Sequence, residues 1–156
     1  MAERAFETPR HFLDYIVTPN FESFRERPDS LQDAFNCIMS LDSLAGFLFL
    51  QHKEFEKTES IDDTDFRHFL AKENSSFGII RDTAKSYKHI KLTRGSPIIK
   101  QADQSVVGNK PYGIGAYGVG KMGGVEVILV LDNEEVKHCL SEAIGALEFL
   151  TSILIE

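Results

Sequence analysis

The stretch LQDAFNCIMSLDSLAGFLFLQHK, residues 31 to 53, decides the fold. At about 100° per residue its apolar side chains fall on one arc of about 140°, as in a long helix that buries one side. Ser30, directly before it, is a suitable N-cap, and Asp33 stands in the first turn, where a carboxylate is favourable. We therefore expect a long core helix. Its buried arc is expected to contain Leu44, Cys37, Leu48, Leu41, Ala34, Ala45, Ile38, Leu31 and Phe49.

Asp42 breaks the apolar pattern of this helix. It projects near the edge of the apolar arc rather than on the polar side. A carboxylate buried there without partners would be very costly, because it would lose its hydration and gain nothing in return. We expect Asp42 to be at least partly buried and to form a structural tie to a neighbouring helix.

The chain before the core helix predicts two shorter helical segments. Thr8 followed by Pro9 is a typical helix start, with threonine as N-cap and proline in the first helical position. We expect this helix to be interrupted by Pro19, which cannot donate a helical hydrogen bond. NFESFRER, residues 20 to 27, then forms another turn or two before the next proline.

Two further helices are expected after the acidic linker that follows the core helix. FRHFLAKEN, residues 66 to 74, predicts the first, and Ser75 or Ser76 can cap the second, FGIIRDTAKSYKHIKL, residues 77 to 92. The apolar side of the second helix is formed by Phe77, Ile79, Ile80, Ala84, Tyr87 and Ile90. The opposite face collects Arg81, Asp82, Lys85, Lys88 and His89.

From Thr93 onward the sequence becomes rich in Gly, Val and Ile, which is typical of β-structure. VEVILVL, residues 125 to 131, predicts a strand, and we favour a returning strand near residues 135 to 139. The alternative is that Asn133 caps a helix that already includes Val136. The last helix is expected to have an apolar stripe of Ile144, Leu147, Leu150 and Leu154.

These elements predict a mainly α fold of the α+β class in one domain, residues 1–156. A bundle of four to five helices would occupy residues 8–92 and 140–154. A glycine-rich β-hairpin, residues 93–139, would be inserted before the last helix.

The glycine-rich stretch GIGAYGVGKMGG, residues 113 to 124, contains both G-x-G-x-x-G and G-x-x-x-x-G-K. Neither pattern has the context that phosphate binding requires. Between Gly118 and Val125 there is no room for a crossover helix of about ten residues. Lys121 is followed by Met122, which has no hydroxyl to coordinate Mg²⁺. We expect no nucleotide at Gly113–Gly124 and interpret the stretch as a glycine-rich loop or bulged hairpin.

The composition predicts a globular protein without a cofactor. Of the 156 residues, 42% are hydrophobic and 26% are charged, as in ordinary folded domains. Cys37 and Cys139 lie far apart, so they form neither a disulfide framework nor a metal-binding pair, and a reducing cytoplasm suits them. The N-terminal residues do not resemble a signal peptide, and by sequence we expect no apolar stretch long enough to span a bilayer. We expect a cytoplasmic location, no metal site and no membrane partner.

The charge is distributed unevenly along the chain. The net charge is −7, whereas the segment from residue 81 to residue 100 carries +5, so that the rest carries −12. An acidic protein repels nucleic acid as a whole, but a local basic patch can still attract an anion. A solvated helix face is the simpler interpretation. The basic residues of the segment are Arg81, Lys85, Lys88, Lys91, Arg94 and Lys100.

RDTAKSYKH, residues 81 to 89, resembles the signature helix of the HEPN superfamily, with Arg near its start, His near its end and a basic loop after it. Together with LDSLAGFLF, residues 41 to 49, it is also similar to small uncharacterised bacterial proteins. The resemblance covers residues 30 to 92 and 140 to 154. It implies a helical bundle that dimerises and, in active members, a metal-independent ribonuclease.

In such a ribonuclease, the catalytic residues would be Arg81, which stabilises the charged phosphorane, and His89, which assists attack by the ribose 2′-OH. Seven residues separate them, which is more than is usual in the family. Eight positions apart on a helix, their side chains are turned about 80° from each other.

Two functions are therefore compatible with the sequence. The first, which we favour, is a non-enzymatic helical interaction protein, a homodimer whose basic helix binds an acidic protein partner or RNA. The alternative is a HEPN-like endoribonuclease of a defence or toxin–antitoxin system. In either case the basic helix face is expected to be largely solvent-accessible. Besides Arg81 and His89, the expected substrate-binding residues are Lys85, Lys88, Asp82 and Arg94.

Overall fold

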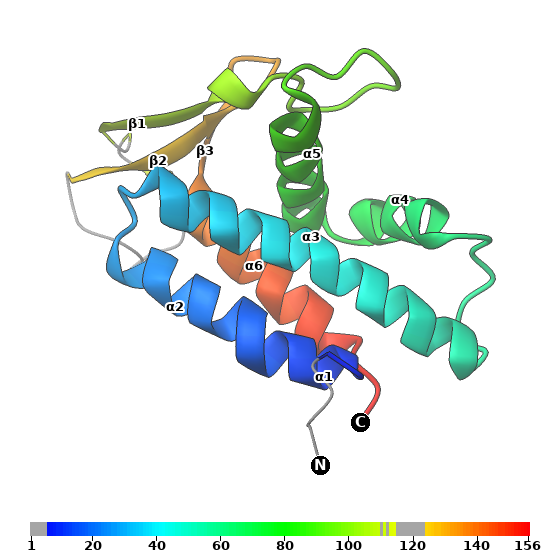
Figure 1. Ribbon diagram of the computed structural model, residues 1–156. Helices are drawn as coiled ribbons and strands as arrows, with labels where there is room; N and C mark the ends of the chain where they lie inside the picture. Colours follow the sequence, from blue (N-terminus) through cyan, green and yellow to red (C-terminus); the bar gives the residue numbers. More distant parts are fainter. Residues whose placement is uncertain (1–5, 110, 112, 115–123) are drawn as a thin grey trace.

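A computed structural model describes residues 6–109, 111, 113–114 and 124–156 (Figure 1). The fold is mainly helical, with a small antiparallel sheet that precedes the last helix, so the expected fold class is confirmed. The elements in chain order are α1 (Pro9–Phe12), a π-helical turn (Leu13–Val17), α2 (Thr18–Glu26), α3 (Leu31–Glu54), α4 (Asp63–Glu73), α5 (Ser75–His89), a 3-10 turn (Ala102–Gln104), β1 (Ser105–Asn109), β2 (Val125–Val130), β3 (Val136–His138) and α6 (Cys139–Ser152).

The long helix α3 is the centre of the core, as its sequence predicts. Ser30 caps it by accepting a hydrogen bond from the backbone N–H of Asp33 at 3.1 Å. The helix packs against α2, α4, α5 and α6, and every member of the expected apolar arc is buried except Leu31. Leu31 is exposed because it is the first residue of the helix, where the neighbouring helices no longer cover it.

The first helix begins as expected but continues through the proline that was expected to interrupt it. Thr8 accepts a hydrogen bond from the backbone N–H of His11 at 3.1 Å, and helical structure then runs from residue 9 to residue 26. A π-helical turn precedes Pro19, in which the N–H of Thr18 bonds to the carbonyl of Leu13, five residues back. A wider turn of this kind can absorb the hydrogen bond that proline lacks.

The junction between α4 and α5 is capped by Asn74 rather than by Ser75 or Ser76. The Asn74 side chain accepts a hydrogen bond from the N–H of Phe77 at 2.8 Å. Ser76 instead lies where α5 meets α6. A Cβ added at Gly145 of α6 would lie only 2.6 Å from the Ser76 hydroxyl oxygen, so glycine permits the close approach of the two helices.

Helix α5 ends at His89, three residues earlier than expected. Ile90 has a positive φ of 64°, which ends the helix. The segment that follows α5 then pairs with residues about ten positions later. The N–H of Leu92 donates to the carbonyl oxygen of Lys100 at 2.7 Å, and the N–H of Ala102 donates to the carbonyl oxygen of Ile90 at 2.9 Å. These bonds form the stem of a loop that runs alongside α5.

The sheet has the order β1-β2-β3, with both pairs antiparallel. Asn109 faces Val125 across β1 and β2, and Ile128 faces His138 across β2 and β3. The returning strand is therefore confirmed, and the last helix starts after it, at Cys139. Because β1 and β2 are antiparallel neighbours, they cannot be the parallel strands of a dinucleotide-binding unit. Most of the glycine-rich stretch, residues 115–123, lies outside the described residues.

By length and composition alone, α3 could cross a membrane, which corrects the expectation that no stretch is long enough. Most of its apolar window is buried inside the protein, among the neighbouring helices. The core helix of a globular fold meets the same criterion, so this feature is weak support for a membrane span.

Candidate anion-binding site

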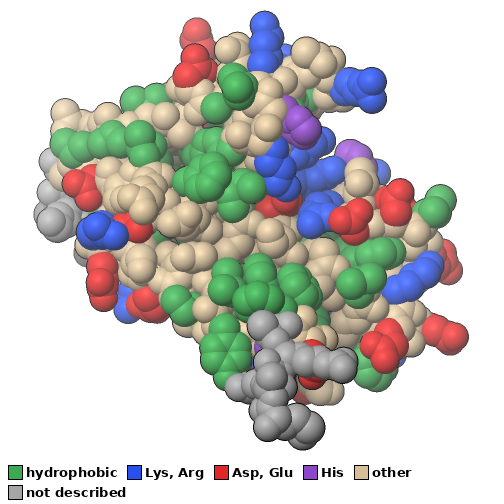
Figure 2. Space-filling view, in the orientation of Figure 1, with side chains coloured by type: hydrophobic (Ala, Val, Ile, Leu, Met, Phe, Trp, Pro, Cys, Tyr) green, Lys and Arg blue, Asp and Glu red, His purple; other side chains and the backbone are tan. Residues whose placement is uncertain are grey.

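A pocket of about 250 Å³ opens between α4, α5 and the loop formed by residues 94–98. We call it the basic pocket. Figure 2 shows Lys, Arg and His side chains gathered in a hollow between the α4 side of the molecule and the loop above α5. The titratable side chains that line the basic pocket are His68, Lys72, Arg81, Asp82, Lys85 and Arg94.

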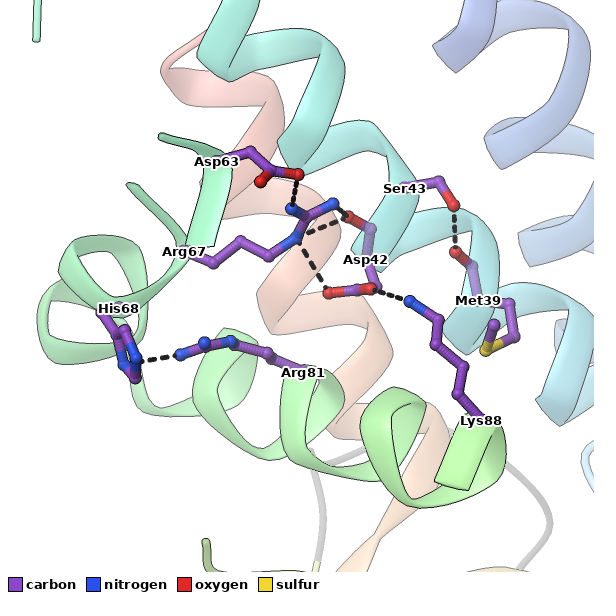
Figure 3. Close-up of polar contacts among 8 residues, drawn as sticks. All are labelled: Met39, Asp42, Ser43, Asp63, Arg67, His68, Arg81 and Lys88. Carbon is purple, nitrogen blue, oxygen red and sulfur yellow. Dashed lines mark hydrogen bonds and ion pairs between the residues drawn. The ribbon is translucent and has the colours of Figure 1, made fainter. Parts of the chain in front are cut away.

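Arg81 is the buried cation of the basic pocket. Only 4% of its surface is exposed, because α4 packs beside the helix that carries it. One guanidinium nitrogen, Nη1, lies 3.0 Å from Nδ1 of His68 (Figure 3). Nε is also buried, and no described residue supplies a hydrogen-bond acceptor for it. Burial lowers the pKa of Arg81, although the carboxylates of Asp82 and Asp42 oppose this effect. The guanidinium, which lines the pocket, therefore has an unused donor.

His68 is the immediate partner of Arg81. Arginine has no acceptor atom, so in this contact the guanidinium must donate and Nδ1 must accept. The imidazole is then neutral and carries its proton on Nε2. Loss of hydration lowers the pKa of His68, and the charges of Arg81, Lys85 and Lys72 lower it further. The surroundings of His68 thus favour the neutral form of this histidine.

Asp82 holds the loop that forms one wall of the pocket. Its Oδ2 accepts a hydrogen bond from the backbone N–H of Ile98 at 2.8 Å. Burial raises the pKa of Asp82, while this hydrogen bond and the charges of Arg81 and Lys85 act in the opposite direction. Gly95 in the same loop has a φ of 71°, a left-handed conformation that glycine adopts without strain. Asp82 therefore has a structural role here, in addition to lining the pocket.

Asp42 lies next to this region and is bound as expected. It is 2% exposed, and its Oδ2 accepts a hydrogen bond from Nζ of Lys88 at 2.9 Å. Arg67 of α4 donates to the Asp42 carbonyl oxygen at 2.9 and 3.3 Å, and its Nε lies 3.2 Å from Oδ1 (Figure 3). Asp63 binds the far side of the same guanidinium at 2.6 Å. The predicted tie between helices is thus confirmed, and it joins α3 to both α4 and α5.

The structure brings together four of the six expected site residues in the basic pocket: Arg81, Asp82, Lys85 and Arg94. The other two do not line it. Lys88 is held by Asp42, and His89 is exposed at the last residue of α5. Eight positions on a helix correspond to a rise of about 12 Å, which separates His89 from Arg81 along the axis. The expectation that the basic helix face is largely solvent-accessible is wrong at Arg81, because α4 covers it.

Two residues of the pocket, His68 and Lys72, did not emerge from the sequence as site candidates. They are four residues apart on α4 and therefore share one face of that helix. The spacing of four residues is the sequence signal that these two side chains lie on one face of a helix. It could not show which helix the face would meet, because periodicity carries no information about the neighbour across the pocket.

A second polar cluster joins the sheet to α6. Nε2 of His138 lies 2.7 Å from Oε2 of Glu126, both side chains are buried, and Nδ1 of His138 lies 2.6 Å from the Ser141 hydroxyl. The nearby Cys139 is also buried, and this burial raises the pKa of its thiol well above the usual value. Burial likewise raises the pKa of Cys37 to about 12. Both thiols are therefore poor nucleophiles at neutral pH.

Among the described residues, no group of three His, Cys, Asp or Glu side chains is arranged to hold a metal ion. Comparison of the chain with protein-family models, with curated proteins and with solved structures found no match.

Proposed function

We propose that this protein is a non-enzymatic helical interaction protein that binds the phosphate groups of single-stranded RNA at the basic pocket. The observation that carries the proposal is Arg81, a buried guanidinium whose Nε has no acceptor in the part of the chain that the structure describes. A buried donor without a partner costs about 1–3 kcal/mol, and more if it is charged. A phosphate oxygen supplies that acceptor and neutralises the charge at the same time.

The surroundings of Arg81 support an anionic ligand. Three further cations, Lys72, Lys85 and Arg94, line the same pocket, against the single carboxylate of Asp82. Their combined field attracts an anion even though the whole protein is acidic.

The basic surface also continues beyond the pocket, which favours RNA over an acidic peptide. Lys91, which does not line the pocket, is exposed on the chain that leaves α5, and this chain leads to Arg94 of the pocket. A polymer with one negative charge per nucleotide can place one phosphate in the pocket and its neighbours along this chain. An acidic protein segment is the other possible ligand, and its binding is an outcome of the test.

The test is fluorescence anisotropy with a labelled single-stranded RNA over a series of salt concentrations. We expect salt-sensitive binding, because Lys and Arg release counterions from the phosphates they contact. Lys85→Gln should weaken binding and reduce the salt slope by about one unit. Lys88→Gln is the matched control, since Lys88 lies on the same helix but is held by Asp42. Its RNA affinity should remain that of the wild type.

Two results would overturn the proposal. Equal losses in Lys85→Gln and Lys88→Gln would show that the basic pocket is not the binding site. Absence of salt-dependent RNA binding would also overturn it, and binding of an acidic peptide in its place would identify the partner as a protein.

The ribonuclease alternative has one structural feature in its favour, which is that Arg81 has a histidine beside it. That histidine is His68, whereas the family resemblance assigns the role to His89. The same RNA should be incubated with the protein in EDTA, and we expect it to remain intact. Cleavage that is lost in Arg81→Ala and in His89→Ala or His68→Asn would establish the alternative. Equal cleavage by all variants would indicate a contaminating nuclease, and the binding function would stand.

A further inference from the structure

We propose that His68 is a ligand-binding residue of the basic pocket, and that a tetrahedral dianion such as a terminal phosphate binds there with uptake of one proton by its imidazole. The inference rests on the proposed phosphate binding and identifies the residue and the charge state that the pocket selects. It follows from the hydrogen-bond pattern of His68 and Arg81 together with the charges that surround them.

In the structure, His68 is the hydrogen-bond acceptor of Arg81. Its Nδ1 lies 3.0 Å from Nη1 of the guanidinium and accepts the hydrogen bond. The contact requires neutral imidazole, because a protonated ring would place two donors and two positive charges against each other. Arg81 cannot withdraw into water, since only 4% of it is exposed.

A bound dianion removes the reason for that arrangement. Its oxygens are stronger acceptors than an imidazole nitrogen, so Arg81 can direct Nη1 and the unused Nε to the ligand. Nδ1 of His68 is then free to take a proton, and the resulting N–H can donate to the same ligand. Arg81 thus exchanges a neutral acceptor, Nδ1 of His68, for a charged ligand oxygen. The protonated imidazole of His68 adds a further positive charge beside the ligand.

The charges that face His68 determine the sign of the pH dependence. Loss of hydration lowers the pKa of His68, the charges of Arg81, Lys85 and Lys72 lower it further, and Asp65 opposes them. A dianion cancels this repulsion, so the pKa of His68 must rise when the ligand binds. The charged groups from all three sides of the pocket are Asp65 and Lys72 of α4, Arg81, Asp82 and Lys85 of α5, and Arg94 of the loop.

Binding is consequently strengthened as the pH falls. Above the pKa of the complex, His68 is neutral in both states and contributes no linkage. Between the pKa of the complex and the lower pKa of the free protein, binding takes up a proton, and the association constant rises by up to about tenfold per pH unit. Below the pKa of the free protein the gain is complete.

The experiment follows His68 itself by NMR, using sulfate as the probe. Sulfate is a tetrahedral dianion that does not titrate near neutral pH, so a change in protonation belongs to the protein. The imidazole signals are titrated with pH in sodium sulfate and in sodium chloride of equal ionic strength, and His68→Asn assigns the signal. We expect the midpoint of His68 to rise by at least about half a pH unit in sulfate. His89, exposed and outside the pocket, is the internal control and should shift less.

The inference would be overturned if the titration midpoint of His68 were the same in sulfate as in chloride of equal ionic strength. Such a result would mean that both salts act on His68 only by general screening. This result leaves the RNA assay unaffected, so the two proposals fail separately. RNA binding without a sulfate effect on His68 would retain the proposed function and exclude proton coupling.

A second arm uses RNA ends as the source of the dianion. A short RNA with a 5′-phosphate should bind more tightly than the same RNA with a 5′-hydroxyl, and His68→Asn should reduce this difference. Equal binding of both ends, or an equal preference in His68→Asn, would overturn the assignment.

Discussion

Replacement of Asp42 tests the tie that holds α3 to α4 and α5. Asp42→Ala removes the acceptor of Lys88 and the carboxylate beside Arg67. Loss of one member of a buried ion pair costs about 3–5 kcal/mol of unfolding free energy when the other charge is left uncompensated. Here Arg67 keeps Asp63 and the backbone carbonyl at position 42, and the Lys88 side chain, which is 44% exposed, can return to water. We therefore expect a smaller loss, about 2–3 kcal/mol.

Asp42→Asn separates charge from shape, because it keeps the volume and one acceptor oxygen. Its expected cost is about 1.5–3 kcal/mol, the range for a hydrogen bond to a charged group. The measurement is urea denaturation followed by circular dichroism at neutral pH. Glu148→Gln, at an exposed carboxylate on α6, is the matched control and should change stability by less than about 0.5 kcal/mol.

A double-mutant cycle of Asp42→Asn with Lys88→Gln isolates the pair. Because Lys88 is partly exposed, its coupling to Asp42 should be modest, about 0.5–1 kcal/mol. The reasoning would be refuted by an Asp42→Asn variant as stable as the Glu148→Gln control. Such a result would mean that the carboxylate is hydrated in the folded protein rather than bound between helices.

Two further predictions concern the helix contact at Gly145 and the glycine-rich stretch. Gly145→Ala should destabilise the protein by about 1–3 kcal/mol in urea denaturation, because its new Cβ would lie 2.6 Å from the Ser76 hydroxyl oxygen. Adding Ser76→Gly to this variant should relieve much of the cost. If Gly145→Ala left the stability unchanged, the two helices would have to lie farther apart than in the structure. Calorimetric titration with ATP, GTP, NAD and FAD should show no binding at residues 113–124, and micromolar binding that Lys121→Ala abolishes would contradict this prediction.

Local chemistry explains why many elements could be predicted from the sequence. The caps Thr8 and Ser30 act within three residues of themselves, so each is read from a short segment. The periodicity around Leu41 identifies a buried face without reference to its neighbours. Pro19 does not interrupt the helix, because a π-helical turn accommodates it. The choice between an interruption and such a turn depends on how well the continued helix packs, which the local sequence does not specify.

The sequence by itself determined the class of fold, the core helix, the buried position of Asp42 and the basic character of the segment from Arg81 onward. These properties depend on helical or strand spacing, which repeats along the chain and needs no partner. The partners were decided by the tertiary structure alone: Lys88 turns to Asp42, and Arg81 turns to His68. The reason is that helix packing sets which faces meet, and packing depends on the shapes of all the helices together. A basic helix face was therefore predictable, whereas the pocket within it was not.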